Sequence, residues 1–400
     1  MTRRCWCVFQ IGAREHYAIP RALHQADVLR QLYTDAWVSP GSSLTSLPTF
    51  QRLAGRFHRD LAAAPVKAPR LGNAAFELRA RIASPAGGWP RTMARNTWFE
   101  RWACRQLRAK QEEGVTVFSY SYAARALFQL AKERGWDRVL GQIDPGPAEE
   151  QRVAAEHRRY PQLSSSWQPA PPTYWQHWAD EIALADRIVV NSHWSWQCLQ
   201  QQGVPDHKLQ LIPLVYEPPE AQQQELSLQA SPPEGAFQLL FLGTIGLRKG
   251  MGRLLEAMRL LDNLPVQLTL AGPSELDPQA WAGAPNISWI GPVPRSRVAE
   301  LYRQAHAMIL PTLSDGFALT QLEALAYNCP VIASEFCGEV VSSGVNGWLL
   351  PSLEPEAIAA TIREAMVTVN LLPRPLQRSS FGLTQLAEAL AHPHLPQING

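Results

Sequence analysis

The chain has 400 residues, of which 46% are apolar and 18% charged, and its formal net charge is +2. At roughly 100–200 residues per domain, this length suggests two or three domains. The composition is ordinary for a globular protein and excludes wholesale disorder. No apolar run approaches the ~18 residues of a membrane-spanning helix. The opening MTRRCWCVFQIGARE predicts a first strand rather than a cleaved leader.

Six cysteines are too few for a disulfide scaffold in a chain of this length. Cys5 and Cys7 have no second pair at metal-ligand spacing. We therefore expect six reduced thiols, most of them buried, in a cytoplasmic protein.

In the first half of the chain, short apolar runs alternate with helical patterns. Strands are expected at 5–11, 28–38, 115–122, 138–144, 187–192 and 209–215, and helices at 123–135 and 147–160. The stretch from about 39 to 96 lacks a strand pattern, so it predicts helices and loops inserted into a sheet domain.

The second half repeats the alternation more regularly. Strands are expected at 237–243, 266–272, 287–293, 307–312, 330–335 and 347–351, and helices at 251–263, 297–305, 318–328 and 354–368. Such βαβ repeats are typical of an α/β fold with doubly wound parallel sheets.

A break in composition separates the halves. Residues 217–236 are rich in Pro, Gln and Ser and predict a linker. We expect an amino-terminal Rossmann-like domain at 1–216, with a helical insertion at about 39–110, and a second Rossmann-like domain at 237–370. Ligands of such folds bind at the carboxyl ends of the strands, so the site should lie in a cleft between the two domains.

The most specific pattern is LPTLSDGFALTQLEALAYNCPVIAS, residues 310–334. A strand, a loop holding Asp315 and a helix holding Glu323 follow one another. Three backbone N–H groups at the start of this helix would form an anion site suited to a diphosphate, namely those of Phe317, Ala318 and Leu319. Glu323 can accept hydrogen bonds from a vicinal diol such as a ribose. Alone, each acid would suit a helix cap or a solvated helix residue; together they favour a binding site.

A second pattern is FLGTIGLRKGMGRLLEA, residues 241–257. It has the spacing of neither a dinucleotide fingerprint nor a P-loop. Arg248 and Lys249 lie in the turn between a strand and a helix, where they could neutralise a pyrophosphate leaving group; the alternative is a pair of surface cations. The sequence has no Asp-x-Asp pair and no His/Cys cluster at metal spacing, so we expect no metal and no cofactor besides a nucleotide co-substrate.

These motifs, with LTLAG and GEVVSSGVNGWLLP, resemble the carboxyl-terminal half of group 1 retaining glycosyltransferases of the GT-B fold, over roughly 237–368. The first half is similar mainly through ADRIVVNS. The resemblance implies metal-independent hexosyl transfer, with retention, from a nucleotide sugar to an acceptor hydroxyl. It also implies that residues 371–400 return to the first domain.

The resemblance assigns roles to individual positions. Arg248 and Lys249 would hold the diphosphate, Asp315 would face the transferred sugar and Glu323 the ribose, while main chain at 291–293 would contact the base. The further donor contacts implied are Gly12, Gly243, Thr244, Val293, Gly316, Phe317, Ala318 and Leu319.

The sequence departs from the family pattern at four positions. Asp315 stands where Glu is usual, and Thr244 where an arginine is common. The amino-terminal Gly-rich loop is reduced to Gly12. Where many members have a first-domain His, this chain offers Asp144, which we expect on the cleft wall as a fourth catalytic residue or, alternatively, as a helix cap.

Other residues leave alternatives open. His16 and Tyr17 follow the first strand and could face an acceptor, although a lone His is more often structural. Tryptophans at 175, 178, 194 and 196 suit a core more often than a sugar platform. Besides transfer, the fold could serve a sugar-nucleotide epimerase, a phosphorylase or a catalytically weak binding protein.

The net charge hides a basic segment. Residues 51–110 hold 13 Lys/Arg and three acids, a balance of +10, which leaves −8 for the rest. With the interleaved Leu53, Phe57, Phe76, Leu78, Trp98, Phe99 and Trp102, it could dock on an anionic membrane and present a lipid-linked or phosphorylated acceptor. A solvated helical face is the alternative, and no nucleic-acid motif is present.

Overall fold

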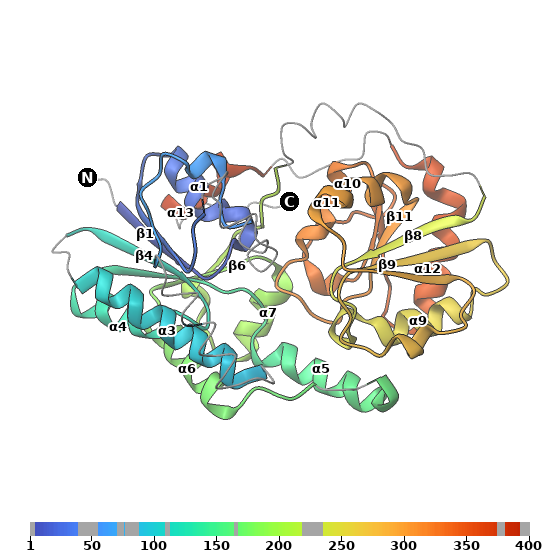
Figure 1. Ribbon diagram of the computed structural model, residues 1–400, viewed down its shortest axis with the longest axis horizontal. Coiled ribbons are helices and arrows are strands. Elements are labelled where there is room, and N and C mark those ends of the chain that lie inside the picture. Colours follow the sequence, from blue (N-terminus) through green and yellow to red (C-terminus); the bar gives the residue numbers. More distant parts are fainter. Residues whose placement is uncertain are drawn as a thin grey trace.

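The computed structural model describes residues 5–38, 55–69, 76, 88–108, 113–163, 167–217, 235–373 and 381–392. They form two parallel sheets, one in each lobe of the molecule (Figure 1). The expectation of two Rossmann-like sheets is confirmed. Most of the expected linker, residues 218–234, lies outside the described residues.

The amino-terminal sheet has seven strands in the order β3-β2-β1-β4-β5-β6-β7. All six residues of β4 are buried, because its apolar run VTVFSY lies at the centre of the sheet and is covered on both faces. The strands are β1 (Cys5–Gln10), β2 (Leu29–Thr34), β3 (Val66–Lys67), β4 (Val115–Tyr120), β5 (Asp137–Gly141), β6 (Arg187–Val190) and β7 (Leu209–Leu211).

Amphipathic helices cover this sheet. They are α1 (Ala18–Gln25), α3 (Gly88–Arg108), α4 (Arg125–Glu133), α5 (Pro147–Arg159), α6 (Pro172–Leu184) and α7 (His193–Gln201). The helix α13 (Leu383–Ala391) lies beside α1 in the first lobe (Figure 1). Its Leu386 and Leu390 join the core formed by Trp6 and Leu23, so the end of the described chain packs on the amino-terminal domain.

The carboxyl-terminal sheet has six strands in the order β10-β9-β8-β11-β12-β13. The strands are β8 (Phe237–Leu242), β9 (Val266–Ala271), β10 (Ile287–Gly291), β11 (Ala307–Leu310), β12 (Val331–Ala333) and β13 (Gly347–Leu349). Its helices are α9 (Met251–Arg259), α10 (Arg295–Gln304), α11 (Leu319–Ala326) and α12 (Pro355–Thr368). The central strands β8 and β11 carry the loops that build the site.

The basic segment differs from its expectation in two respects. Val66 and Lys67 form β3 at the edge of the sheet, because the short run pairs with Leu32 and Tyr33 of β2. Phe99 is fully buried, and Trp98 and Trp102 pack against the same core. These rings hold α3 on its own domain, so they cannot supply apolar contact to a membrane.

Part of that segment falls outside the described residues, namely Arg52, Leu53, Arg70, Glu77, Leu78, Arg79, Arg81 and Lys110. Five of the six cysteines are buried, which confirms the expectation of mostly buried thiols. Among the helices that the structure describes, none combines the length and apolar character needed to cross a membrane.

Candidate active site

The centre of the site is the contact between two loops of the carboxyl-terminal domain. One follows β8 and contains the short helix η7 (Leu247–Lys249); the other follows β11. Leu313 donates its N–H to the carbonyl of Arg248 at 3.0 Å, which fixes the loops side by side. Gly250 has φ of 74°, and a Cβ there would lie 1.8 Å from the carbonyl oxygen of Pro311, so only glycine allows this close approach.

This contact brings Lys249 onto Asp315. The Lys249 ammonium donates to the Asp315 carboxylate, and Arg248 Nη1 lies 3.5 Å from the same oxygen. Burial alone would raise the pKa of Asp315, but Lys249, Arg248 and the N–H of Phe317 outweigh it and hold the pKa below its ordinary value. Asp315 is therefore an anion held by two cations.

The helix that follows does not offer the three free N–H groups that the sequence predicted. Ala318 donates its N–H to the carbonyl of Cys337 at 2.8 Å, and Phe317 donates to the Asp315 carboxylate. The cause is the turn η9 (Glu335–Cys337), which passes over the loop before α11. Phe317 and Ala318 therefore have no free N–H group in this structure, and their contact with a diphosphate stays a prediction; Leu319 is the first residue of α11.

Gly316 lies where the two domains touch. A Cβ at this position would come within 2.1 Å of the carbonyl oxygen of Ile143, which follows β5 of the amino-terminal domain. Trp194 Nε1 donates to Ser314 Oγ at 3.0 Å across the same junction. The donor-side loop is therefore in direct contact with the first domain.

Glu323 is engaged on both sides. Tyr302 donates its hydroxyl to Glu323 Oε2 at 3.2 Å, and His16 Nε2 of the first domain lies 3.6 Å from Oε1. Arg295 Nη2 in turn lies 2.9 Å from His16 Nδ1. Glu323 is therefore no solvated helix residue, and the contact joins two predicted residues from different domains.

The loop holding His16 is strained. Glu15, His16 and Tyr17 have φ of 51°, 51° and 61°, a left-handed run that is rare for residues other than glycine. Such strain is concentrated at functional sites. Tyr17 is buried in the amino-terminal core with Trp6 and Leu23. Of the predicted pair His16 and Tyr17, only His16 therefore reaches the second domain.

Asp144 lies at the end of β5, on the amino-terminal side of the junction. Its Oδ1 accepts hydrogen bonds from the Tyr122 hydroxyl at 2.5 Å, the Gly146 N–H at 2.9 Å and Gln142 Nε2 at 3.3 Å. The residue before α5 is Gly146, so Asp144 forms a turn rather than a helix cap. Burial raises the pKa of Asp144, although these bonds and Arg248 oppose the rise.

The remaining predicted contacts lie in loops that follow the strands β1, β8 and β10. Gly12 donates its N–H to Asp35 Oδ1 at 2.7 Å. Gly243 and Thr244 follow β8 and are half-buried. Val293 follows β10 and packs partly against the second core. Of the predicted tryptophans, Trp178 is buried in the amino-terminal domain beside Phe99, and Trp175 and Trp196 pack partly on the same cluster.

Sequence reasoning missed Glu149 and Tyr122. Glu149 is in the first turn of α5, and its Oε1 lies 3.6 Å from Arg248 Nη1. Tyr122 follows β4 with φ of 75° and bonds Asp144. An acid after Pro147 indicates only a helix start, so no local signal could place it beside a cation 99 positions away.

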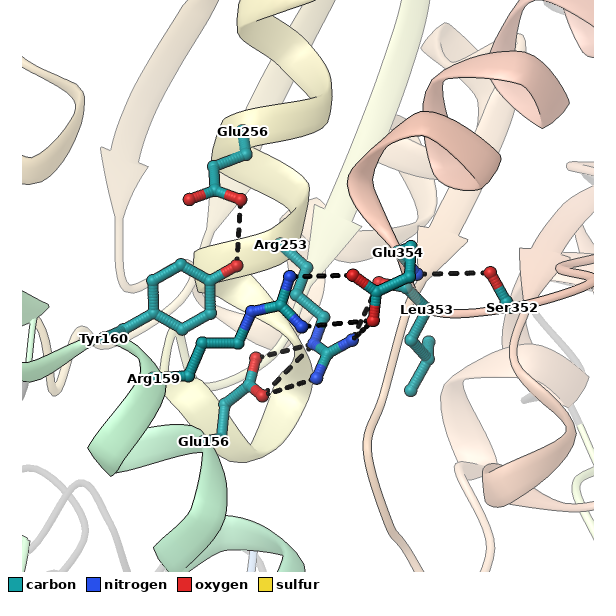
Figure 2. A network of polar contacts seen from close by, with 8 residues as sticks. All are labelled: Glu156, Arg159, Tyr160, Arg253, Glu256, Ser352, Leu353 and Glu354. Carbon is teal, nitrogen blue, oxygen red and sulfur yellow. Dashed lines mark hydrogen bonds and ion pairs between the residues drawn. The ribbon is translucent and has the colours of Figure 1, made fainter.

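Helix α5 begins at this site, and residues at its other end contact the second domain (Figure 2). Glu156, 3% exposed, accepts from Arg253 Nε at 2.8 Å and Nη2 at 2.9 Å. Tyr160 donates to Glu256 at 3.0 Å, and its ring belongs to the core of the second domain. One helix therefore links the site to the interface.

Within the described ranges, no group of three or more His, Cys, Asp or Glu side chains could hold a metal ion. The acids near the junction face cations instead. The arrangement can bind an anion if Lys249 and Arg248 exchange Asp315 for it.

Two parallel Rossmann-like sheets, with cations of the second sheet facing polar loops of the first, define the class as GT-B. Residues 236–367 match the model of the family "Glycosyl transferases group 1". The carboxyl-terminal domain is therefore homologous to the group 1 glycosyltransferases, the family that its motifs resemble.

Relatives extend this result. The chain is 28% identical to D-inositol 3-phosphate glycosyltransferase 1 of Catenulispora acidiphila over 261 residues, 58% of this chain and 62% of that protein. It is 24% identical to the amylovoran biosynthesis glycosyltransferase AmsK of Erwinia amylovora over 179 residues, 40% of this chain and 44% of that protein. The chain thus matches about half the length of these relatives.

Among solved structures, HepE of Anabaena in complex with UDP has the same fold. The TM-score is 0.57 over 99% of this chain and 96% of that chain, at 14% sequence identity. Because identity is so low, this likeness shows the shared GT-B fold alone.

Proposed function

We propose that the protein transfers a hexosyl group, with retention, from a nucleoside-diphosphate sugar to an acceptor hydroxyl, without a metal. The meeting of Lys249, Arg248 and Asp315 at the domain junction carries this proposal. Two cations in a partly desolvated place can neutralise a departing diphosphate, which is the electrostatic help that this leaving group needs. Holding donor and acceptor in register supplies the rest.

The proposal gives a role to each predicted residue except Phe317 and Ala318, whose N–H groups are engaged in the structure. Lys249 and Arg248 take the diphosphate, Asp315 faces the transferred sugar and Glu323 takes the ribose. Asp144 lies on the opposite wall, near the sugar. Further donor contacts come from Gly12, Gly243, Thr244, Val293, Gly316 and Leu319.

UDP-glucose is the first donor to test, since HepE was solved with UDP and with UDP-glucose. A glycan or lipid-linked glycan is the proposed acceptor, in keeping with AmsK, which is a biosynthetic glycosyltransferase for amylovoran. We place the reaction in the cytoplasm. Contact with an anionic membrane is proposed on charge alone, through the exposed Arg101, Arg105 and Arg108 of α3.

A thermal-shift screen of UDP-, GDP- and ADP-sugars tests the donor, because a ligand that binds only the native state raises Tm by mass action. Diphosphate release is then measured with and without glycan acceptors. Release that requires an acceptor supports transfer. Conversion of the donor sugar without an acceptor would indicate an epimerase, and binding without any release a binding protein.

A further inference from the structure

Glu149 is an acid of the amino-terminal domain placed at the cations of the carboxyl-terminal domain. It is the third residue of α5, its side chain is 16% exposed, and Oε1 lies 3.6 Å from Arg248 Nη1. Arg248 also lies 3.5 Å from Asp315 and donates to the carbonyl of Ser314 at 3.2 Å. Two acids from different domains therefore share one guanidinium.

The hydrogen bonds of the two amino-terminal acids differ. Asp144 Oδ1 accepts from a hydroxyl, a backbone N–H and an amide, which stabilise its ionised form. Glu149 bonds Ser314 through one oxygen, but its buried Oε2 has no partner. A buried carboxylate oxygen without a donor is costly, and protonation removes most of that cost.

The charges around Glu149 come from four elements. Arg248 follows β8, Asp315 follows β11, Asp144 follows β5, and the thiol of Cys198 lies on α7. Burial raises the pKa of Cys198 to about 11, so this thiol is neutral at physiological pH. Arg248 therefore faces three of these acids, Asp315, Glu149 and Asp144, and Lys249 is paired with Asp315. A diphosphate brings further negative charge to the same two cations.

We propose that Glu149 is a positioning residue of the donor site: it is protonated whenever a nucleoside diphosphate is bound, takes up that proton on binding wherever it starts ionised, and so leaves Arg248 to the phosphates. The inference rests on the proposed function and adds a residue from the first domain to the donor site. The proton comes from solvent and adds to the Glu149 carboxylate; no other bond forms or breaks. Burial raises the pKa of free Glu149 to about 8; Arg248 opposes the rise, and Asp144 and Asp315 add to it.

UDP binding to the full chain, measured by calorimetry between pH 7 and 9, tests this inference. Above pH 7 the terminal phosphate of UDP is already ionised, because its pKa is about 6. If only neutral Glu149 allows tight binding, Kd should rise about tenfold from pH 7 to pH 9. At pH 9, titrations in buffers of different ionisation enthalpy should give an uptake close to one proton per UDP.

Glu149→Gln keeps the size of the side chain and removes its charge, so its Kd should stay within about twofold over the same range. Glu150→Gln is the matched control: Glu150 accepts from Trp175 Nε1 at 3.0 Å, away from Arg248, and this variant should keep the wild-type pH dependence. Proton uptake is measured on the wild-type protein, so this part of the test does not depend on whether a variant folds. UDP binding that is independent of pH, or equally dependent in Glu149→Gln, would overturn the inference alone; no binding of UDP, GDP or ADP at any pH would overturn the proposed donor as well.

Discussion

The two domains place polar residues at the same edge of similar sheets but build these edges differently. In the carboxyl-terminal domain, Lys249 and Asp315 come from neighbouring loops and pair with each other. In the amino-terminal domain, the loops are strained: five of the six described non-glycine residues with positive φ lie there, among them His16, which contacts the second domain, and Tyr122, which bonds Asp144. The family motif therefore identifies the edge of the carboxyl-terminal sheet, whereas backbone strain identifies the edge of the amino-terminal sheet.

The difference shows which residues of the site are held in place within one domain and which are held by contact between the two domains. In the second domain, the loop that carries Lys249 and Arg248 is anchored by one hydrophobic core. The same core also binds the end of α5 through Tyr160. The first domain places Glu149 at a helix start and His16 on a loop, where they contact Arg248 and Glu323 across the junction, whereas Asp144 is held by bonds within its own domain. Variants can test this asymmetry.

The largest effect should come from the interface. Arg253→Ala leaves Glu156 buried without its cation, which typically costs about 3–5 kcal/mol. We expect a lower free energy of unfolding in urea and an earlier proteolytic cut near the end of α5. Arg159→Ala is the control, since its exposed pair with Glu354 should contribute about 1 kcal/mol or less. Equal losses in both variants would contradict the docking of α5 through a buried pair.

The next effect concerns the carboxyl-terminal edge. Lys249→Ala removes one of two cations proposed for the leaving diphosphate, so kcat should fall roughly 10²–10³-fold. Asp315 also loses its main partner, so its pKa should rise toward the ordinary value. Lys132→Ala, at an exposed position on α4, is the matched control. Full turnover by Lys249→Ala, with donor affinity unchanged, would remove this residue from the site.

The sequence predicted the features that depend on local pattern. The buried run at β4, the proline at the start of α5 and the loop–helix motif around Asp315 each have a recognisable local signature. Other features had no such local signature. The carbonyl of Cys337 takes the N–H of Ala318 because a turn 17 positions later folds back over the loop.

The contact between His16 and Glu323 joins positions 307 apart and exists only once both domains are docked. The strand β3 is similar, because two residues become a strand only when β2 offers an unpaired edge. Tertiary contacts therefore decide the amino-terminal half of the site, whereas the motif predicts the carboxyl-terminal loop and helix but not the turn that covers them.

The smallest expected effect is that of Asp144→Asn, which asks whether the amino-terminal edge takes part in turnover. Asparagine keeps an oxygen for the bonds from Tyr122 and Gly146 but loses the charge. If Asp144 faces the transferred sugar, kcat should fall roughly 10–100-fold, the value of one hydrogen bond to a charged group. Unchanged turnover would leave Asp144 a structural residue.

Stability gives an independent reading of the same variant. Burial raises the pKa of Asp144, so the folded chain keeps this proton to higher pH than the unfolded chain, whose aspartates titrate near 3.9. The wild type therefore loses stability as the pH rises from about 4 through the folded pKa, and the asparagine variant does not. The difference in unfolding free energy, variant minus wild type, should increase between pH 4 and pH 8 in urea titrations. Asp186→Asn is the control, because Asp186 pairs with Arg138 away from the junction. A difference for Asp144→Asn that stays flat or decreases with pH would show that its charge is well solvated, and Asp144 would then be a poor candidate for the cleft wall.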